Sequence, residues 1–294
     1  MNYKRTTGEV AFDVFNYLLM LFIIMVMTLP FINQIALAFS NNTAVLAGEV
    51  SLIPRNFTLA AFHYTFADPR FFLSFRNSVY FTAVAVLLQV SATTIFSYPL
   101  SMPHLKGRKI IMTALIFSML FGTGGLIAEF LNIRRFGLID SYWALWLPGM
   151  VNVWNIIIMK SFLQRMPDEL IESAEIDGAS HFRIFLQIVV PLSKAPIATI
   201  SLFVAVSAWN TFFSALVYIN SRELLLLAVY LMEVLTGRTT PVGPEMDTVF
   251  FNDPVTPFSI RAATLLASTV PIVLVYPFLQ KYFVKGMLIG AIKG

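Results

Sequence analysis

The chain has no cysteine, only three histidines among its 294 residues, and few charged side chains. The absence of cysteine excludes disulfide bonds, thiol catalysis and thiolate metal sites. The histidines (His63, His104 and His181) lie too far apart in sequence for metal-ligand spacing, so we expect no metal site. The phosphate-binding pattern G-x-x-x-x-G-K-[ST] is also absent, so the chain has no such loop with which to bind ATP.

Hydrophobic residues make up 57% of the chain and charged residues 12%, and the mean hydropathy is +0.76. Soluble domains carry about 25% charged residues, so this composition indicates a membrane protein. A helix needs about 20 apolar residues to span the hydrocarbon core. Six runs of that length predict an all-α polytopic membrane protein, a single transmembrane domain over residues 1–294. The predicted spans are about 14–40, 76–100, 110–130, 142–162, 193–219 and 260–284.

The distribution of Lys and Arg predicts the orientation, because these residues concentrate in cytoplasmic loops. With the N-terminus inside, the cytoplasmic segments hold twelve of the twenty basic residues and seven of the sixteen acidic ones. We therefore expect both termini in the cytoplasm, and an even number of spans agrees with this. The excess of basic residues that gives the net charge of +4 lies in the predicted cytoplasmic segments. This distribution is explained by membrane orientation, so we expect no nucleic-acid binding.

Glycine and proline interrupt several of the apolar runs. Pro30 predicts a kink in the first span, and the glycine-rich residues 122–125 predict that the third span is unwound there. Glu129, just after this break, has two interpretations. It either lines an outer mouth or is a loop residue paired with Arg134 or Arg135.

One polar segment, residues 166–191, separates the fourth and fifth apolar runs. Pro167 suits the start of a helix and acidic residues follow it, so the pattern predicts a helix over about 168–177. Gly178 suits a left-handed C-cap, and Ser180 can cap a second short helix. The two helices would lie across the inner membrane surface.

This segment resembles the EAA loop of ABC importer permeases, the cytoplasmic element through which an ATPase moves the membrane domain. The resemblance rests on Glu172, Ser173, Ala174, Asp177, Gly178, Ala179, Ile188 and Pro191 within a coupling loop at 164–191. Nearly the whole chain is similar to permeases of the carbohydrate type, such as the smaller maltose permease, and closer still to the subfamily importing complex oligosaccharides, alginate among them. Further matching residues are Asn77-Ser78, Tyr98-Pro99-Leu100 and Trp209-Asn210. Ser173 replaces the family's usual Ala, and Ala128-Glu129 replaces an expected Pro and neutral residue.

The resemblance implies a transport subunit, not an enzyme, that moves an oligosaccharide or polysaccharide fragment across the cytoplasmic membrane by alternating access. Its partners would be a homologous second permease, two ATPase subunits, an extracellular or periplasmic sugar-binding protein and membrane lipid. ATP and Mg would be bound by the ATPase, so we expect no cofactor in this chain. The predicted helix would enter an ATPase cleft, where Glu172 and Asp177 meet Arg or backbone donors. Three small residues, Ser173, Ala174 and Ala179, would let the partner's backbone approach.

Two polar clusters at membrane depth are candidates for a sugar path. They are Asn152, Trp154 and Asn155 in the fourth run, where the two amides share a helix face, and Ser207, Trp209, Asn210, Thr211 and Ser214 in the fifth. Amides can bond sugar hydroxyls while an indole stacks on the C–H face. The alternative is that these side chains only bond helices to one another.

Two rival functions remain open on sequence alone. A secondary transporter or channel subunit would need ionisable residues at mid-span, and none is placed there unambiguously. An intramembrane enzyme would need a nucleophile–base pair or a motif such as H-E-x-x-H, and none is present. The outer loop 237–259, with Asp247 and Asp253, either contacts the binding protein or is a solvated loop.

Overall fold

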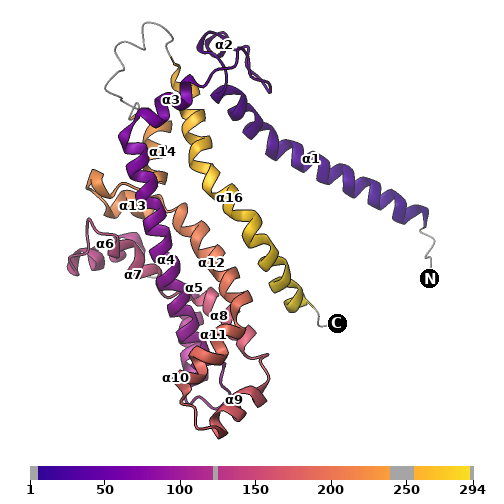
Figure 1. Ribbon diagram of the computed structural model, residues 1–294, viewed down its shortest axis with the longest axis vertical. Coiled ribbons are helices and arrows are strands. Elements are labelled where there is room, and N and C mark those ends of the chain that lie inside the picture. Colours follow the sequence, from indigo (N-terminus) through magenta and orange to yellow (C-terminus); the bar gives the residue numbers. More distant parts are fainter. Residues whose placement is uncertain (1–5, 122–124, 239–254, 292–294) are drawn as a thin grey trace. The chain divides into compact units, whose positions relative to one another are not determined.

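The computed structural model describes residues 6–121, 125–238 and 255–291, and this part of the chain is built from helices (Figure 1). Apart from one bridge between Ser40 and Phe57, it contains no strand in these ranges. The predicted all-α class is therefore confirmed for them. The chain divides into two compact units, Met1–Phe72 with Leu231–Thr269 and Leu73–Tyr230 with Val270–Gly294. Most of the outer loop 237–259, including Asp247 and Asp253, lies outside the described residues.

The first unit is rich in helices whose ends are tied by polar side chains. It contains α1 (Thr7–Ala38), α2 (Asn42–Leu46), α3 (Ala60–Ala67), the start of α4 (Pro69–Ser101), the end of α14 (Leu227–Leu235) and the start of α16 (Pro257–Ala291). Asp68 is buried and accepts two bonds from the Arg70 guanidinium at the start of α4. Thr65 and Thr264 share a buried hydrogen bond of 3.2 Å, which joins α3 to α16.

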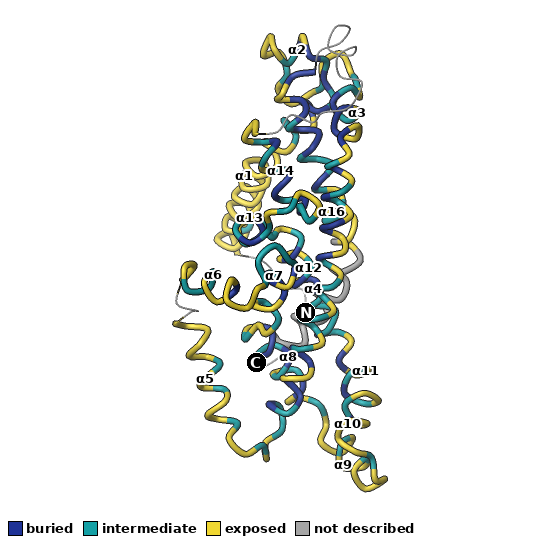
Figure 2. The backbone as a smooth tube through the Cα atoms, turned by 90° about the vertical axis from the view of Figure 1, so that its left-hand side faces the viewer, coloured by how far each residue is buried: buried dark blue, intermediate teal, exposed yellow. Residues whose placement is uncertain are grey.

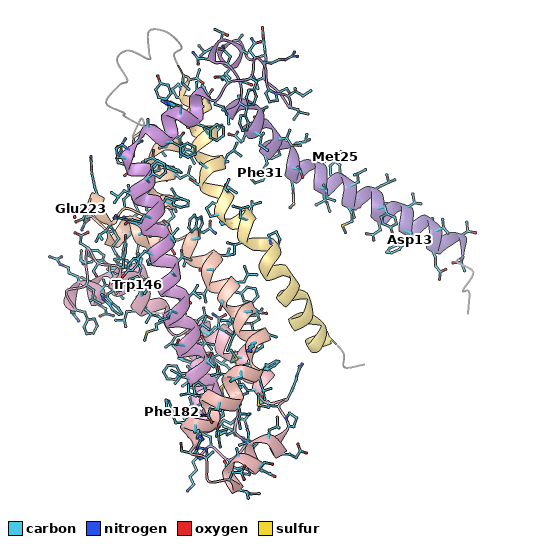
Figure 3. The ribbon with its side chains drawn as sticks, in the orientation of Figure 1. Asp13, Met25, Phe31, Trp146, Phe182 and Glu223 are labelled. Carbon is cyan, nitrogen blue, oxygen red and sulfur yellow. The ribbon has the colours of Figure 1, made fainter. Side chains whose placement is uncertain are left out.

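Helix α1 presents apolar side chains on all sides. Thr6 and Glu9 cap its first turn reciprocally. Its side chains, Met25 and Phe31 among them, project away from the helix along its length (Figure 3). Only Ala36 and Ala38, in its last turn, are buried. Because a helix with this composition is stable only in an apolar surrounding, α1 has the character of a membrane span.

The second unit holds the remaining helices. They are the rest of α4 and of α16, α5 (Arg108–Phe121), α6 (Leu126–Arg135), α7 (Trp143–Gly149), α8 (Val153–Leu163), α9 (Asp168–Ile176), α10 (His181–Ile184), the π-helix η1 (Phe185–Val189), α11 (Val190–Leu192), α12 (Lys194–Trp209), α13 (Phe213–Tyr218), the 3₁₀ turn η2 (Arg222–Leu224) and the start of α14. In both Figure 1 and Figure 2, α9 and α10 lie at one end of this unit, while α6, α7 and α13 lie further along it.

Among the described residues, three helices are long and apolar enough to cross a membrane: α1, α4 and the Pro257–Val275 part of α16. Two helix pairs broken by a bend, α5 with α6 and the His181–Leu192 helices with α12, would raise the count to five. The third predicted span is broken where its glycines stand, since α5 ends at Phe121 and α6 begins after Gly125. Residues 122–124 lie outside the described residues. Six spans stay a prediction.

The predicted fourth span, about 142–162, is not one continuous helix. The structure has two shorter helices there, α7 and α8, separated by residues 150–152. Pro148 and Gly149 form the end of α7, and both residues favour helix termination. Asn152 then caps α8, because its side chain accepts a hydrogen bond from the Asn155 N–H at 3.1 Å.

The predicted fifth span, about 193–219, is also interrupted. α12 ends at Trp209, Asn210 is its C-cap, and α13 begins at Phe213. At its other end, α12 makes a 77° bend with the preceding helices at Ser193. Pro191 lacks the N–H that an α-helix would use at that position, and the π-helix η1 lies directly before it.

The core of the second unit joins α4, α7, α8 and α12. Phe81 and Trp146 stack with ring centroids 5.8 Å apart, and the Trp146 indole N–H donates to the Phe81 carbonyl at 3.2 Å. Met159 and Ile200 are fully buried in the same cluster. Packed aromatic and aliphatic side chains of this kind fix the four helices relative to one another.

Side chains of α4 and of Tyr142, the N-cap of α7, hold residues 223–227, where η2 ends and α14 begins. Asn77 donates to the carbonyls of Glu223 and Leu225 at 2.7 and 3.1 Å. The Ser78 hydroxyl accepts from the Leu227 N–H at 2.8 Å. The Tyr142 hydroxyl donates to the Leu224 carbonyl. These bonds satisfy backbone groups that no helix satisfies, as buried backbone requires.

Candidate functional site

The polar segment predicted to form two helices does form them. α9 covers Asp168–Ile176, with Pro167 as its N-cap. Gly178 has the expected left-handed conformation (φ +78°), and its N–H and that of Ala179 donate to α9 carbonyls. The Ser180 hydroxyl accepts from the Arg183 N–H and so caps α10. The turn favours glycine at 178, because a residue with a Cβ is sterically strained at a positive φ.

The outward side of α9 and α10 combines apolar and acidic groups, and we call it the docking face. Its large apolar members are Leu170, Ile176 and Phe182, and Ile176 is 87% exposed. Five acidic residues and no basic one lie within 168–180. Figure 2 shows α9 and α10 mainly as exposed, and Figure 3 shows Phe182 at this end of the unit. Exposed apolar groups beside charges are typical of a protein–protein contact.

The eight residues predicted for ATPase coupling divide into two sets. Glu172, Ser173, Asp177, Gly178 and Pro191 are exposed. Ala174, Ala179 and Ile188 pack against the core of the second unit instead. Ala174 and Ala179 are half-buried and pack α9 on its own chain, and whether they also admit a partner's backbone stays a prediction. Among the predicted small residues, only Ser173 faces outward, with its hydroxyl bonded to the Glu169 carbonyl.

Two neighbouring cavities of the second unit carry polar linings. The first, with a volume of about 390 Å³, has the polar members Gln89, Glu129, Ser207, Thr211, Ser214 and Tyr218. The second, of about 320 Å³, is lined by Asn152, Trp154 and Asn155 together with Gln89 and Ser207. Because Gln89 and Ser207 line both cavities, the two are adjacent. We call them together the polar tract.

The tract brings together most of the residues predicted for a sugar path. Ser207, Thr211, Asn155 and Trp154 line it as predicted, although this geometry does not test whether sugar passes there. Asn152 lines it too, but as the cap of α8 and not on a helix face shared with Asn155. The amide and hydroxyl groups could bond several hydroxyls of one ligand.

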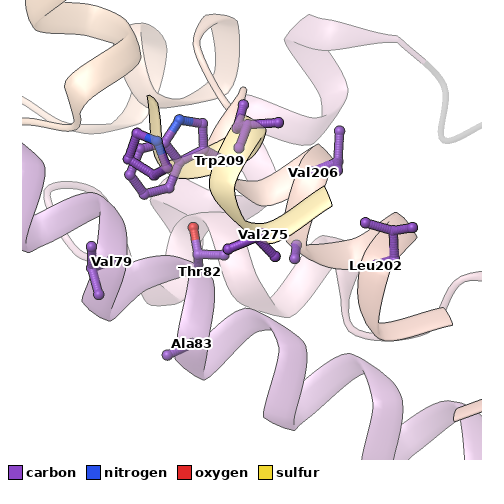
Figure 4. A pocket seen from close by; sticks show the side chains of 10 residues that line it. Val79, Thr82, Ala83, Leu202, Val206, Trp209 and Val275 are labelled. Carbon is purple, nitrogen blue, oxygen red and sulfur yellow. The ribbon is translucent and has the colours of Figure 1, made fainter. Parts of the chain in front are cut away.

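Trp209 and Asn210 line neither cavity of the polar tract, so their place in a sugar path stays a prediction. Trp209 packs edge-to-face on Phe75 at 5.9 Å and lines a separate apolar cavity between α4, α12 and α16 (Figure 4). Leu202 and Val275 line that cavity as well. Asn210 is exposed and donates to the Val206 carbonyl within its own helix. A helix turns about 100° per residue, which places Trp209 on the side of α12 opposite Ser207. Asn210 is the C-cap of α12, and its amide bonds back to the helix and does not line the tract.

Sequence reasoning missed Gln89 and the environment of Glu129. Gln89 is the amide that joins both cavities, and it lies so close to α7 that a Cβ at Gly149 would be 2.9 Å from its side-chain nitrogen. An amide within the otherwise apolar stretch 83–90 of a membrane-length helix was the available signal. Glu129 faces the first cavity, and no ion pair joins it to Arg134 or Arg135 in the described chain, so that alternative is wrong.

A carboxylate holds the loop after α6 to the loop after α13. Asp140, at φ +61°, accepts hydrogen bonds from the N–H groups of Asn220 and Ser221 and from the Ser221 hydroxyl. Its own N–H donates to the Tyr218 carbonyl at 2.8 Å. The hydroxyl and backbone donors of Ser221 and Asn220 lower the pKa of Asp140 below its ordinary value of 3.8.

We predict that the Asp140 contribution to stability disappears in acid. A lowered native-state pKa means that the contribution is complete above pH 3.8 and is lost as the pH falls through the native pKa. Asp140→Asn keeps an acceptor and tolerates the left-handed backbone but removes the charge. The difference in thermal stability between the two purified proteins should therefore be constant from pH 6 to about 5 and shrink below pH 3.8. A difference that stays constant down to pH 2.5, about one unit lower, would contradict this.

These features define a class of protein. Long apolar helices, a polar tract between them and an exposed acidic helix at one end, without a nucleotide-binding loop, are the features of a membrane transport subunit driven by another protein. The chain belongs to the family "Binding-protein-dependent transport system inner membrane component", which matches residues 8–289. Like its relatives, it is a permease subunit without a catalytic site, and the ATPase is a separate subunit.

The chain is similar to individual members over almost its full length. Protein LplC of Bacillus subtilis (strain 168) is 42% identical over 99% of this chain and 97% of its own. The polygalacturonan/rhamnogalacturonan transport system permease protein YtcP of the same strain is 39% identical, over 96% and 98%. A chain of a bacterial ABC transporter involved in the import of the acidic polysaccharide alginate superposes with a TM-score of 0.89. It is 28% identical and covers 96% of this chain and 100% of that one.

Proposed function

We propose that this chain is one of two homologous permeases in an ATP-driven importer that moves an oligosaccharide or polysaccharide fragment across the cytoplasmic membrane. The family membership supports transport with a binding protein, and the names of the relatives support a carbohydrate. Two ATPase subunits bind the ATP and Mg, and a sugar-binding protein delivers the substrate. The chain forms a single domain of six spans with both termini in the cytoplasm.

The observation that carries this proposal is the construction of α9. One side of this helix packs on the core that also holds α8 and α12, while the docking face is free for a partner. The ATPase contacts the docking face, and Glu172 and Asp177 accept bonds from its Arg or backbone donors. ATP-driven closure of the ATPase pair moves α9 and converts the permeases between inward- and outward-facing states. Membership of this family argues against the secondary transporter or channel.

A single introduced thiol tests the docking face. Because the chain has no cysteine, Ile176→Cys carries a unique site for a benzophenone photocrosslinker. Ile176 is 87% exposed on the docking face, so we expect this variant to crosslink to the ATPase in the assembled complex. Leu46→Cys is the matched control, since Leu46 is 69% exposed on α2, and we expect no ATPase product from it. A complex that hydrolyses ATP but gives no product from position 176 would refute the assignment.

A further inference from the structure

Glu129 is the one residue of the polar tract that carries a formal charge. The linings of the two cavities consist otherwise of apolar, hydroxyl, amide, indole and phenol side chains, counted over the described residues. Glu129 is partly buried in the first turn of α6, which begins after Gly125 at φ +89°. The N-terminal end of a helix favours a negative group, so the carboxylate is stabilised there without a cation. Its neighbour in the cavity is the Tyr218 hydroxyl.

Among the described residues, no cation lines the cavity opposite this carboxylate. Arg134 and Arg135 belong to the same helix but are exposed, and a rotation of about 100° per residue places them on other sides of α6 than Glu129. Arg76 is exposed and is absent from the lining of either cavity. The tract therefore presents neutral hydrogen-bonding groups and one uncompensated negative charge to whatever enters it.

This arrangement discriminates between two kinds of sugar. A neutral oligosaccharide offers hydroxyl donors that the Glu129 carboxylate and the Gln89 amide can accept. A uronate oligosaccharide brings carboxylates of the same sign into a partly desolvated cavity, where repulsion between charges is stronger than in water. A tract built for uronates would need arginine or lysine in its lining.

We propose that Glu129 is a specificity-determining residue that makes the tract favour uncharged oligosaccharides over uronate oligosaccharides. The inference rests on the proposed transport function and adds the substrate class, which the names of the relatives do not decide. Glu129 acts on the sugar in the membrane subunit, separately from any selection by the binding protein.

The test compares two probes that differ only in oxidation at C6: α-1,4-linked galactotriose and α-1,4-linked trigalacturonate. Binding is measured by equilibrium dialysis to the assembled complex, held outward-facing by ATP with a hydrolysis-deficient ATPase and without binding protein. We expect the wild-type complex to bind galactotriose at least about tenfold more tightly, a difference of about 1.4 kcal/mol. Glu129→Gln should reduce this preference about tenfold by improving trigalacturonate binding, with little change for galactotriose.

Arg135→Gln is the matched control, because it removes a charge from another side of α6 and should leave the preference unchanged. An equal preference in wild type and Glu129→Gln overturns the inference, and so does tighter binding of trigalacturonate by the wild type. Failure of both probes to bind to any variant also overturns it. A second readout tests the proposed transport function independently of Glu129. It is the stimulation of ATP hydrolysis by loaded binding protein, measured on the same complexes with active ATPase. If that stimulation is present while the preference is unchanged, only the role of Glu129 fails.

Discussion

Gly178→Val should abolish the stimulation of ATP hydrolysis by loaded binding protein while leaving the chain inserted in the membrane. Gly178 ends α9 at φ +78°, a conformation that costs a β-branched residue about 1–2 kcal/mol. A Cβ there meets no atom within 4 Å, so the damage comes from the backbone and not from a clash. The valine will favour another turn and change the angle between α9 and α10. We expect stimulation to fall at least about tenfold, the effect of roughly 1.4 kcal/mol.

Gly48→Val is the matched control for this substitution. Gly48 has φ +72° and the same open surroundings, so the backbone strain is comparable, but it follows α2 and lies far from α9 in sequence. The control should retain stimulated hydrolysis. If both variants behave like wild type, the α9 turn does not couple the ATPase to transport, and if both lose activity the effect is one of general stability.

Asn77→Leu should lower the thermal stability of the purified chain in detergent by about 5–10 °C. Asn77 is 7% exposed, and its amide is the donor for the carbonyls of Glu223 and Leu225. Leucine has a similar volume but leaves both carbonyls without that donor, at about 1–3 kcal/mol each. The midpoint of heat-induced aggregation, followed by size-exclusion chromatography, measures the effect.

Asn210→Leu provides the comparison for Asn77→Leu. The Asn210 amide is exposed and donates only to the Val206 carbonyl, which already accepts the Asn210 backbone N–H. No backbone group is orphaned, so its midpoint should stay within about 1–2 °C of wild type. Equal losses in the two variants would mean that the amide of Asn77 does not hold residues 223–227.

Strong boundary residues made α9 predictable, whereas the high hydropathy around the helix breaks concealed them. Pro167, Gly178 and Ser180 are strong boundary residues, and each takes the position that its backbone preference requires. The run 142–162 is largely apolar, and mean hydropathy cannot distinguish one helix of 21 residues from α7 and α8 separated by a short break. Pro148 and Asn152 were the signals of that break.

Only some of the residues that line the polar tract could be predicted from the sequence. Polar residues within an apolar run could be recognised as buried or cavity-lining, and Asn155, Ser207 and Thr211 were found in this way. Which residues of α12 share a cavity depends on packing between segments distant in sequence, so the sequence did not show that Trp209 lines a different cavity from Ser207. The inward packing of Ala174 has the same origin, since a small residue suits a partner's surface and its own core equally well.

Helix α9 links the docking face to the core of the second unit, because one side of it is exposed and the other is packed. Ile171 and Ala174 pack into the same cluster as Ile200 and Val204 of α12, and α12 also carries Ser207 at the junction of the two cavities. A close-packed cluster transmits displacement because it resists compression. If the proposed ATPase contact displaces α9, this packing would carry the displacement to α12 and the tract. Substitutions that loosen the packing of Ile171 and Ala174 should therefore weaken the coupling of ATP hydrolysis to transport.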